Sequence, residues 1–160
     1  SYQGDGDLAA IGTAEIIHAA ARNENITVVF INNAIFGMTG GQLAPTTLPG
    51  MKSTTSVQGR DTKKQGYPIK VCELLSSLDG SSYLERCAVD TPKNIIKTKK
   101  ALKTAFKNQI DNKGFSLIEI LSMCPTNWGL SPVQAKKWLD EVMVKYYSLG
   151  VFCDRTKEER

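Results

Sequence analysis

The sequence predicts an α/β fold in which helices cover both faces of a mostly parallel sheet. Along the 160 residues, segments with helical spacing of apolar positions alternate with short apolar, β-branched runs. Such runs are typical of strands that are buried on both sides in a parallel sheet. Alternating strands and helices connect through right-handed crossovers, which place helices over the sheet. A composition of 41% hydrophobic and 22% charged residues suits one globular domain.

The first half of the chain contains the predicted end of a strand at Asp5, one predicted helix, a second predicted strand and a long irregular segment. Apolar residues at helical spacing predict a helix over residues 7–22, and I-T-V-V-F-I predicts a strand over residues 26–31. From residue 33 to about residue 66 the sequence is rich in Gly, Thr, Pro and Ser. A compact domain rarely contains so long a segment without a functional reason, so we expect a binding loop here.

The second half resumes the alternation of helices and strands. The patterns predict helices over residues 69–78, 92–110 and 131–147, and strands over residues 82–89 and 115–121. Thr91 and Pro92 have the residue types of an N-cap and a first helical position. Ser131, Pro132 and Gln134 form a capping-box pattern at the start of the last helix.

Composition excludes several classes of protein. The longest apolar run, residues 26–31, is far shorter than the roughly 18 residues that a membrane span needs. No signal segment is visible at the start of the chain, so we expect a cytoplasmic protein without membrane contact. The four cysteines are widely spaced and form no C-x-x-C pair, which does not support a zinc ribbon or a disulfide framework. We expect Cys72, Cys87 and Cys153 to be buried as small apolar residues.

Two polar motifs follow predicted strands and point to a metal site. Gly4-Asp5-Gly6 stands directly before the first helix, and Asn32-Asn33 ends the strand over residues 26–31. Because one helix and one strand separate the motifs, Asp5 and Asn33 should lie side by side at the carboxyl edge of the sheet. A carboxylate and a carboxamide offer two hard oxygen ligands, which suits Mg²⁺. The start of the helix near Asp7 would face phosphate groups bound at the same place.

These motifs resemble those of a known enzyme family. G-D-G followed after 25 residues by N-N resembles the signature of thiamine diphosphate enzymes. Three further segments, I-F-G-M-T-G-G-Q (35–42), A-P-T-T (44–47) and C-P-T-N-W-G-L-S-P (124–132), resemble the beta subunit of 2-oxoacid:ferredoxin oxidoreductases. The similarity is to the 2-oxoisovalerate and 2-oxoglutarate branches in particular. It implies the thiamine diphosphate-binding fold, with residues 1–160 as the C-terminal portion of that domain in an N-terminally truncated subunit.

The resemblance also implies roles for individual residues. Asp5, the side chain of Asn33 and the backbone carbonyl of Ile35 would bind Mg²⁺. The residues expected around the thiamine diphosphate are Gly4, Asp5, Gly6, Asp7, Asn33, Thr39 and Gly40. Cys124 would be one of four thiolates that hold a 4Fe-4S cluster. The other three family ligands lie upstream of the diphosphate motif and are absent here.

The activity that the resemblance implies is oxidative decarboxylation of a 2-oxoacid, such as 2-oxoisovalerate, to acyl-CoA and CO₂. Ferredoxin would accept the electrons and coenzyme A the acyl group. The expected partners are an alpha subunit with the pyrimidine-binding domain, which carries the activating glutamate, and further ferredoxin-like subunits. We identify no catalytic residue in this chain and expect it to be inactive alone. The alternative is a noncatalytic binding or assembly module of the same fold.

A basic segment, residues 93–113, contains seven lysines and one acidic residue. Such a segment is most often a solvated helix face, and the functional alternative is docking of an acidic ferredoxin or of the phosphates of coenzyme A. The segment contains no arginine and no nucleic-acid recognition motif, so we expect no binding of nucleic acid.

Overall fold

The computed structural model describes residues 1–156, and these residues contain one five-stranded sheet. Its strands are β1 (Tyr2–Gln3), β2 (Thr27–Asn32), β3 (Ser81–Ala88), β4 (Phe115–Leu121) and β5 (Gly150–Asp154), in the order β1-β2-β4-β3-β5. The first four are parallel, and β5 runs antiparallel to β3 at the edge. The predicted α/β class with a mostly parallel sheet is therefore confirmed.

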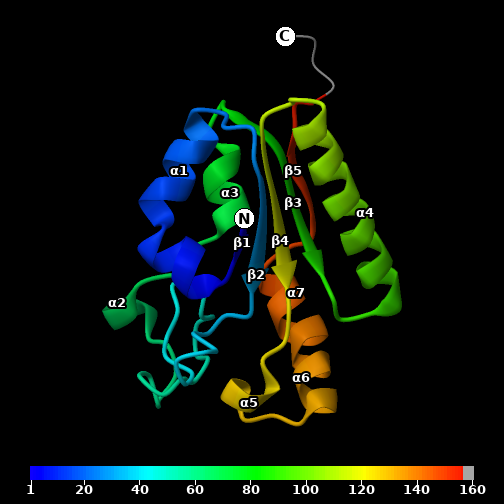
Figure 1. Cartoon of the computed structure of the whole chain (residues 1–160). Coiled ribbons are helices and arrows are strands. Elements are labelled where there is room, and N and C mark those ends of the chain that lie inside the picture. Colours follow the sequence, from blue (N-terminus) through cyan, green and yellow to red (C-terminus); the bar gives the residue numbers. More distant parts are fainter. Residues whose placement is uncertain (157–160) are drawn as a thin grey trace.

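Helices lie on both faces of this sheet (Figure 1). Helices α1 (Thr13–Ala21) and α3 (Val71–Ser76) cover one face, and α4 (Pro92–Ile110) covers the other. The remaining helices are α2 (Thr62–Gln65), α5 (Pro125–Trp128), α6 (Pro132–Trp138) and α7 (Val144–Tyr146). They gather with the long loop beneath the carboxyl ends of the strands (Figure 1). None of the helices in residues 1–156 has the length and apolar composition to cross a membrane.

Two predicted helices are interrupted by π-helical turns. The helix predicted over residues 7–22 consists of η1 (Asp7–Ile11) and α1, and the last helix contains η2 (Leu139–Met143) between α6 and α7. At the first interruption the Gly12 N–H donates to Asp7 O at 2.6 Å. A Cβ on Gly12 would lie 2.4 Å from the same oxygen, so this turn requires a glycine.

The capping signals predicted the starts of two helices correctly, whereas the strand β5 was not predicted. The Thr91 side chain accepts from Asn94 N at the start of α4, and Ser131 forms the predicted capping box with Gln134. Strand β5 was not predicted, because its short sequence forms a strand only through pairing with β3. The segment from residue 33 to residue 66 is irregular as expected, apart from α2.

Buried apolar side chains fill both faces and the carboxyl end of the sheet. Phe115 and Leu117 pack on the face toward α1 and α3, and Ile118 and Ile120 pack against the helix α4. A third cluster joins Ala34, Leu48 and Leu121 to residues 139–147 of the last helix. This third cluster anchors the loop after β2 against the C-terminal helix, which brings the predicted site residues onto a rigid base.

Candidate functional site

Asp5 and Asn33 lie side by side at the carboxyl ends of β1 and β2. The two strands pair in parallel with Gln3 opposite Phe30, so both chains leave the sheet at the same edge. The Asn33 N–H donates to Asp5 Oδ2 at 3.1 Å. The juxtaposition expected from the strand ends is therefore present.

The Asp5 carboxylate is almost fully buried, with 3% of its surface exposed. Its Oδ1 accepts the Thr46 hydroxyl and its Oδ2 accepts the Asn33 N–H. Burial raises the pKa of Asp5 from 3.8 to about 7; these two hydrogen bonds oppose the shift and the Glu119 charge adds to it. A buried carboxylate with two donors and no cation gains stability when a metal ion neutralises it.

The chain turns sharply after β2. Ala34 has a φ of 60°, a left-handed conformation that few non-glycine residues adopt. Asn32 Oδ1 accepts from Ala34 N at 3.1 Å, and Asn33 Oδ1 accepts from Ile35 N at 3.2 Å. These side-chain bonds stabilise the turn, which directs Ile35 and the following residues along the rim of a cavity.

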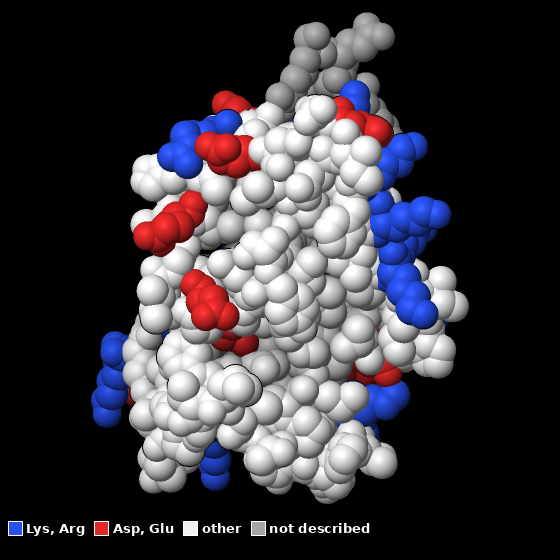
Figure 2. Space-filling view, viewed as in Figure 1, with Lys and Arg blue, Asp and Glu red and all other residues white. Residues whose placement is uncertain are grey.

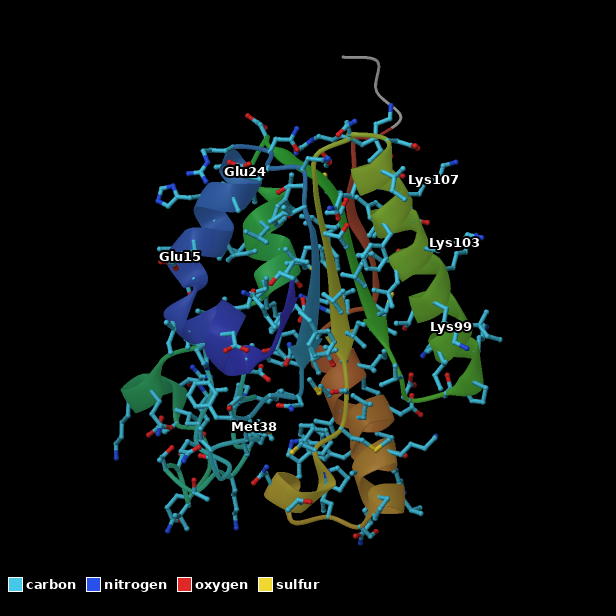
Figure 3. All side chains as sticks on the ribbon, in the orientation of Figure 1. Glu15, Glu24, Met38, Lys99, Lys103 and Lys107 are labelled. Carbon is cyan, nitrogen blue, oxygen red and sulfur yellow. The ribbon has the colours of Figure 1, made fainter. Side chains whose placement is uncertain are left out.

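This cavity has a volume of about 820 Å³ and contains most of the predicted site. Its lining comes from three segments: residues 4–7 with Ala10 and Ile11, residues 33 and 35–39, and residues 124, 126 and 127. Gly40, with a φ of 111°, stands next to the lining but does not belong to it. Met38 is fully exposed, and Figure 3 shows it among the loops beneath the strands. No Lys, Arg or His of residues 1–156 lines the cavity.

The first helical turn offers free backbone amides at the cavity. Leu8 N–H makes the first intrahelical hydrogen bond, to Gly4 O at 3.0 Å. The amides of Gly6 and Asp7 therefore have no intrahelical acceptor. Both residues line the cavity, so this turn suits an anion.

The C-P-T-N-W-G segment is bonded to the loop after β2. Trp128 Nε1 donates to Asn33 O at 3.1 Å, and Asn127 Nδ2 donates to Gly37 O at 2.9 Å. Asn127 Nδ2 also lies 3.2 Å from Cys124 Sγ. These contacts place the Cys124 thiol next to the loop that contains the Asn33 side chain.

Three residues that build the site were given no role from the sequence, although Thr46 and Asn127 lie in the A-P-T-T and C-P-T-N-W-G-L-S-P segments. Thr46 contacts Asp5, and Arg60 makes six hydrogen bonds to backbone carbonyls of the long loop. Asn127 connects two loops.

The donor set fits Mg²⁺ but not a complete iron-sulfur cluster. A buried carboxylate, a neighbouring carboxamide and phosphate oxygens are what Mg²⁺ prefers. A 4Fe-4S cluster needs four thiolates, and residues 1–156 contain no group of three or more His, Cys, Asp or Glu side chains that could hold a metal. Cys124 lies at the cavity, whereas Cys72, Cys87 and Cys153 are buried as expected. Burial raises the pKa of Cys72, and raises that of Cys87 to about 12.

The basic segment lies away from the cavity. All six lysines of α4 are exposed. Figure 2 shows basic side chains gathered along the side of the molecule where α4 lies in Figure 1. Figure 3 shows Lys99, Lys103 and Lys107 pointing outward from α4. A role in docking stays a prediction.

Comparisons with known proteins agree with this geometry. Residues 1–120 match the family model described as thiamine pyrophosphate enzyme, C-terminal TPP binding domain. The chain is 46% identical to ketoisovalerate oxidoreductase subunit VorA of Methanothermobacter marburgensis over 98% of this chain and 33% of that subunit. It is 40% identical to 2-oxoglutarate synthase subunit KorB of the same organism, over 88% of this chain and 47% of that subunit.

A solved structure shows the same fold. It is the 2-oxoglutarate:ferredoxin oxidoreductase of Magnetococcus marinus with 2-oxoglutarate, coenzyme A and succinyl-CoA bound; the TM-score is 0.67 and the identity 27%, over 87% of this chain and 43% of that chain. The chain thus spans a third to less than half of the relatives it matches. The resemblance to subunits of 2-oxoacid:ferredoxin oxidoreductases is confirmed. With its family model matched over residues 1–120, the chain belongs to the thiamine pyrophosphate enzymes, whose C-terminal TPP-binding domain it contains.

Proposed function

We propose that this chain supplies the Mg²⁺ and thiamine diphosphate site of a 2-oxoacid:ferredoxin oxidoreductase, which converts a 2-oxoacid to acyl-CoA and CO₂. The observation that carries the proposal is the buried Asp5 carboxylate beside Asn33 in an 820 Å³ cavity. The names of the relatives support the reaction class. The coenzyme A and succinyl-CoA bound to the Magnetococcus marinus enzyme support coenzyme A as the acyl acceptor.

In this proposal the residues of the chain hold and orient the cofactor. Asp5, the Asn33 side chain and the Ile35 carbonyl bind Mg²⁺, and the amides of Gly6 and Asp7, with Thr39 nearby, face the diphosphate. A metal ion is needed to balance the charge of the diphosphate, because no cationic side chain of residues 1–156 lines the cavity. Bound thiamine diphosphate supplies the carbon nucleophile and the electron sink for decarboxylation. Ile11, Phe36 and Met38 are large apolar side chains among the residues that line the cavity.

The proposed substrate is a branched 2-oxoacid such as 2-oxoisovalerate. The lining offers apolar side chains at Ile11, Phe36 and Met38 and no cation that could bind a second carboxylate. We expect the assembled enzyme to show a higher kcat/KM for 2-oxoisovalerate than for 2-oxoglutarate, measured with a viologen as electron acceptor. A higher kcat/KM for 2-oxoglutarate would contradict the proposed substrate but would not contradict the proposed cofactor site.

Other subunits complete the proposed enzyme. An alpha subunit brings the pyrimidine-binding domain, ferredoxin-like subunits and ferredoxin carry the electrons, and Cys124 contributes one thiolate to a 4Fe-4S cluster whose other ligands lie outside this chain. The half-buried position of Cys124 at the cavity supports its part in this arrangement.

Calorimetry on this chain tests the cofactor site. We expect thiamine diphosphate to bind in the presence of Mg²⁺, and we expect Asp5→Ala and Asn33→Ala to abolish the binding because each removes a metal ligand. Asp140→Ala, at an exposed acid outside the cavity lining, is the matched control. If Asp5→Ala bound thiamine diphosphate and Mg²⁺ with wild-type affinity, the proposed metal site would be wrong. Absence of wild-type binding would favour the alternative, a noncatalytic module.

A further inference from the structure

The A-P-T-T segment, residues 44–47, connects the two strand ends that form the proposed metal site. The Thr46 hydroxyl donates to Asp5 Oδ1, and the Thr47 hydroxyl donates to Ala34 O at 2.6 Å. Both threonines are completely buried. One short segment thus bonds directly to the carboxylate after β1 and to the backbone after β2.

Every carbonyl of this segment accepts a hydrogen bond from a buried side chain. Arg60 Nη1 donates to the carbonyls of residues 44, 45 and 47 at 3.2, 3.1 and 2.7 Å. The Tyr147 hydroxyl donates to the remaining one, Thr46 O, at 2.6 Å. Arg60 is 6% exposed and Tyr147 is fully buried. The backbone that orients the Thr46 hydroxyl is therefore fixed on both sides.

Tyr147 belongs to a distant part of the chain. It follows α7, is 101 residues away from Thr46, and lies outside residues 1–120 that the family model covers. Its ring packs against the Arg86 guanidinium, 5.2 Å from centroid to carbon, and against Tyr146. The third apolar cluster holds the same residue. The residue that ends the last helix is thus connected to Asp5 through a single intermediate residue, Thr46.

We propose that Thr46 and Tyr147 are positioning residues, which hold the Asp5 carboxylate in the orientation that binds Mg²⁺ and so make metal affinity depend on the C-terminal helix. This inference rests on the proposed function. Ligating carboxylates are commonly oriented by hydrogen bonds of this kind. Tyr147 acts on the carboxylate only through Thr46, so its effect should disappear when the Thr46 hydroxyl is absent.

Calorimetric titration of Mg²⁺ at saturating thiamine diphosphate tests the proposal. Thr46→Val should weaken Mg²⁺ binding by roughly 10- to 100-fold, as expected for loss of an outer hydrogen bond to a metal ligand. Thr46→Ser keeps the hydroxyl and should restore wild-type affinity. Tyr147→Phe should weaken binding by roughly 3- to 10-fold, the size of one neutral hydrogen bond. Tyr146→Phe, at the neighbouring ring, is the control and should bind Mg²⁺ like the wild type.

The double variant separates positioning from general destabilisation. Thr46→Val/Tyr147→Phe should bind Mg²⁺ no more weakly than Thr46→Val alone, and urea unfolding should show all variants folded. Wild-type Mg²⁺ affinity in folded Tyr147→Phe, or additive losses in the double variant, would overturn the inference. If Tyr147→Phe does not fold, equal affinities of Thr46→Val and Thr46→Ser overturn it instead. A wild type that binds no Mg²⁺ overturns both this inference and the proposed function.

Discussion

Replacing Arg86 with methionine should lower the free energy of unfolding by about 3 to 5 kcal/mol, because it leaves a buried carboxylate without its counter-ion. Arg86 Nε lies 2.8 Å from Glu119 Oε2, and neither side chain has exposed surface. The same guanidinium binds Glu73, with Nη1 2.9 Å from Oε1. These carboxylates raise the pKa of Arg86 against the opposing effect of burial, and Arg86 lowers the pKa of Glu73 although burial acts to raise it.

Urea unfolding at neutral pH measures this loss. Arg22→Met is the matched control, because the Arg22–Glu24 pair is exposed and should contribute less than about 1 kcal/mol. Adding Glu119→Gln to Arg86→Met should recover part of the stability, since glutamine can still accept from Asn32 Nδ2, which lies 2.7 Å from Glu119 Oε1. A loss below about 1 kcal/mol in Arg86→Met would show that water solvates Glu119.

Replacing Asp5 with asparagine should stabilise the metal-free chain at pH 8 and abolish Mg²⁺ binding. The pKa of Asp5 is about 7 in the fold against 3.8 for the free side chain. Folding therefore favours the protonated Asp5 carboxyl. The stability that this carboxyl adds to the fold is complete below pH 3.8 and is lost as the pH rises toward 7. At about 1.4 kcal/mol for each pKa unit, Asp5→Asn should be more stable than the wild type by up to about 4 kcal/mol at pH 8.

Unfolding in urea with EDTA at pH 4 and pH 8 checks this second expectation. The wild type and Asp5→Asn should have similar stabilities at pH 4 and should diverge as the pH rises. Asp140→Asn, at an exposed acid, should follow the wild type at both values. A wild type that becomes more stable than Asp5→Asn at pH 8 without metal would contradict the role of burial.

The sequence predicted those parts of the molecule that depend on local signals. Strands β2 and β4 are short segments rich in apolar residues, and the caps at Thr91 and Ser131 marked where α4 and α6 begin. The proximity of Asp5 and Asn33 was also predictable, because a helix and a strand of ordinary length return the chain to the same edge of the sheet.

The features that escaped prediction depend on contacts between distant residues. Arg86 and Glu119 lie in two different strands, and only the register of β3 against β4 brings these residues together as an ion pair. The hydrogen bond from Tyr147 to Thr46 spans 101 residues, and no local sequence pattern predicts this pairing. Neither helical periodicity nor turn composition contains such information, so the support of the site became visible only in three dimensions.

The central claim is that the cavity at the ends of β1 and β2 binds a divalent metal together with a diphosphate. The most direct measurement is an anomalous difference map from a crystal of this chain soaked with Mn²⁺ and thiamine diphosphate. We predict one strong peak within coordination distance of Asp5, the Asn33 side chain and the Ile35 carbonyl. A bound diphosphate with no metal peak beside Asp5, or a metal bound elsewhere, would contradict the account.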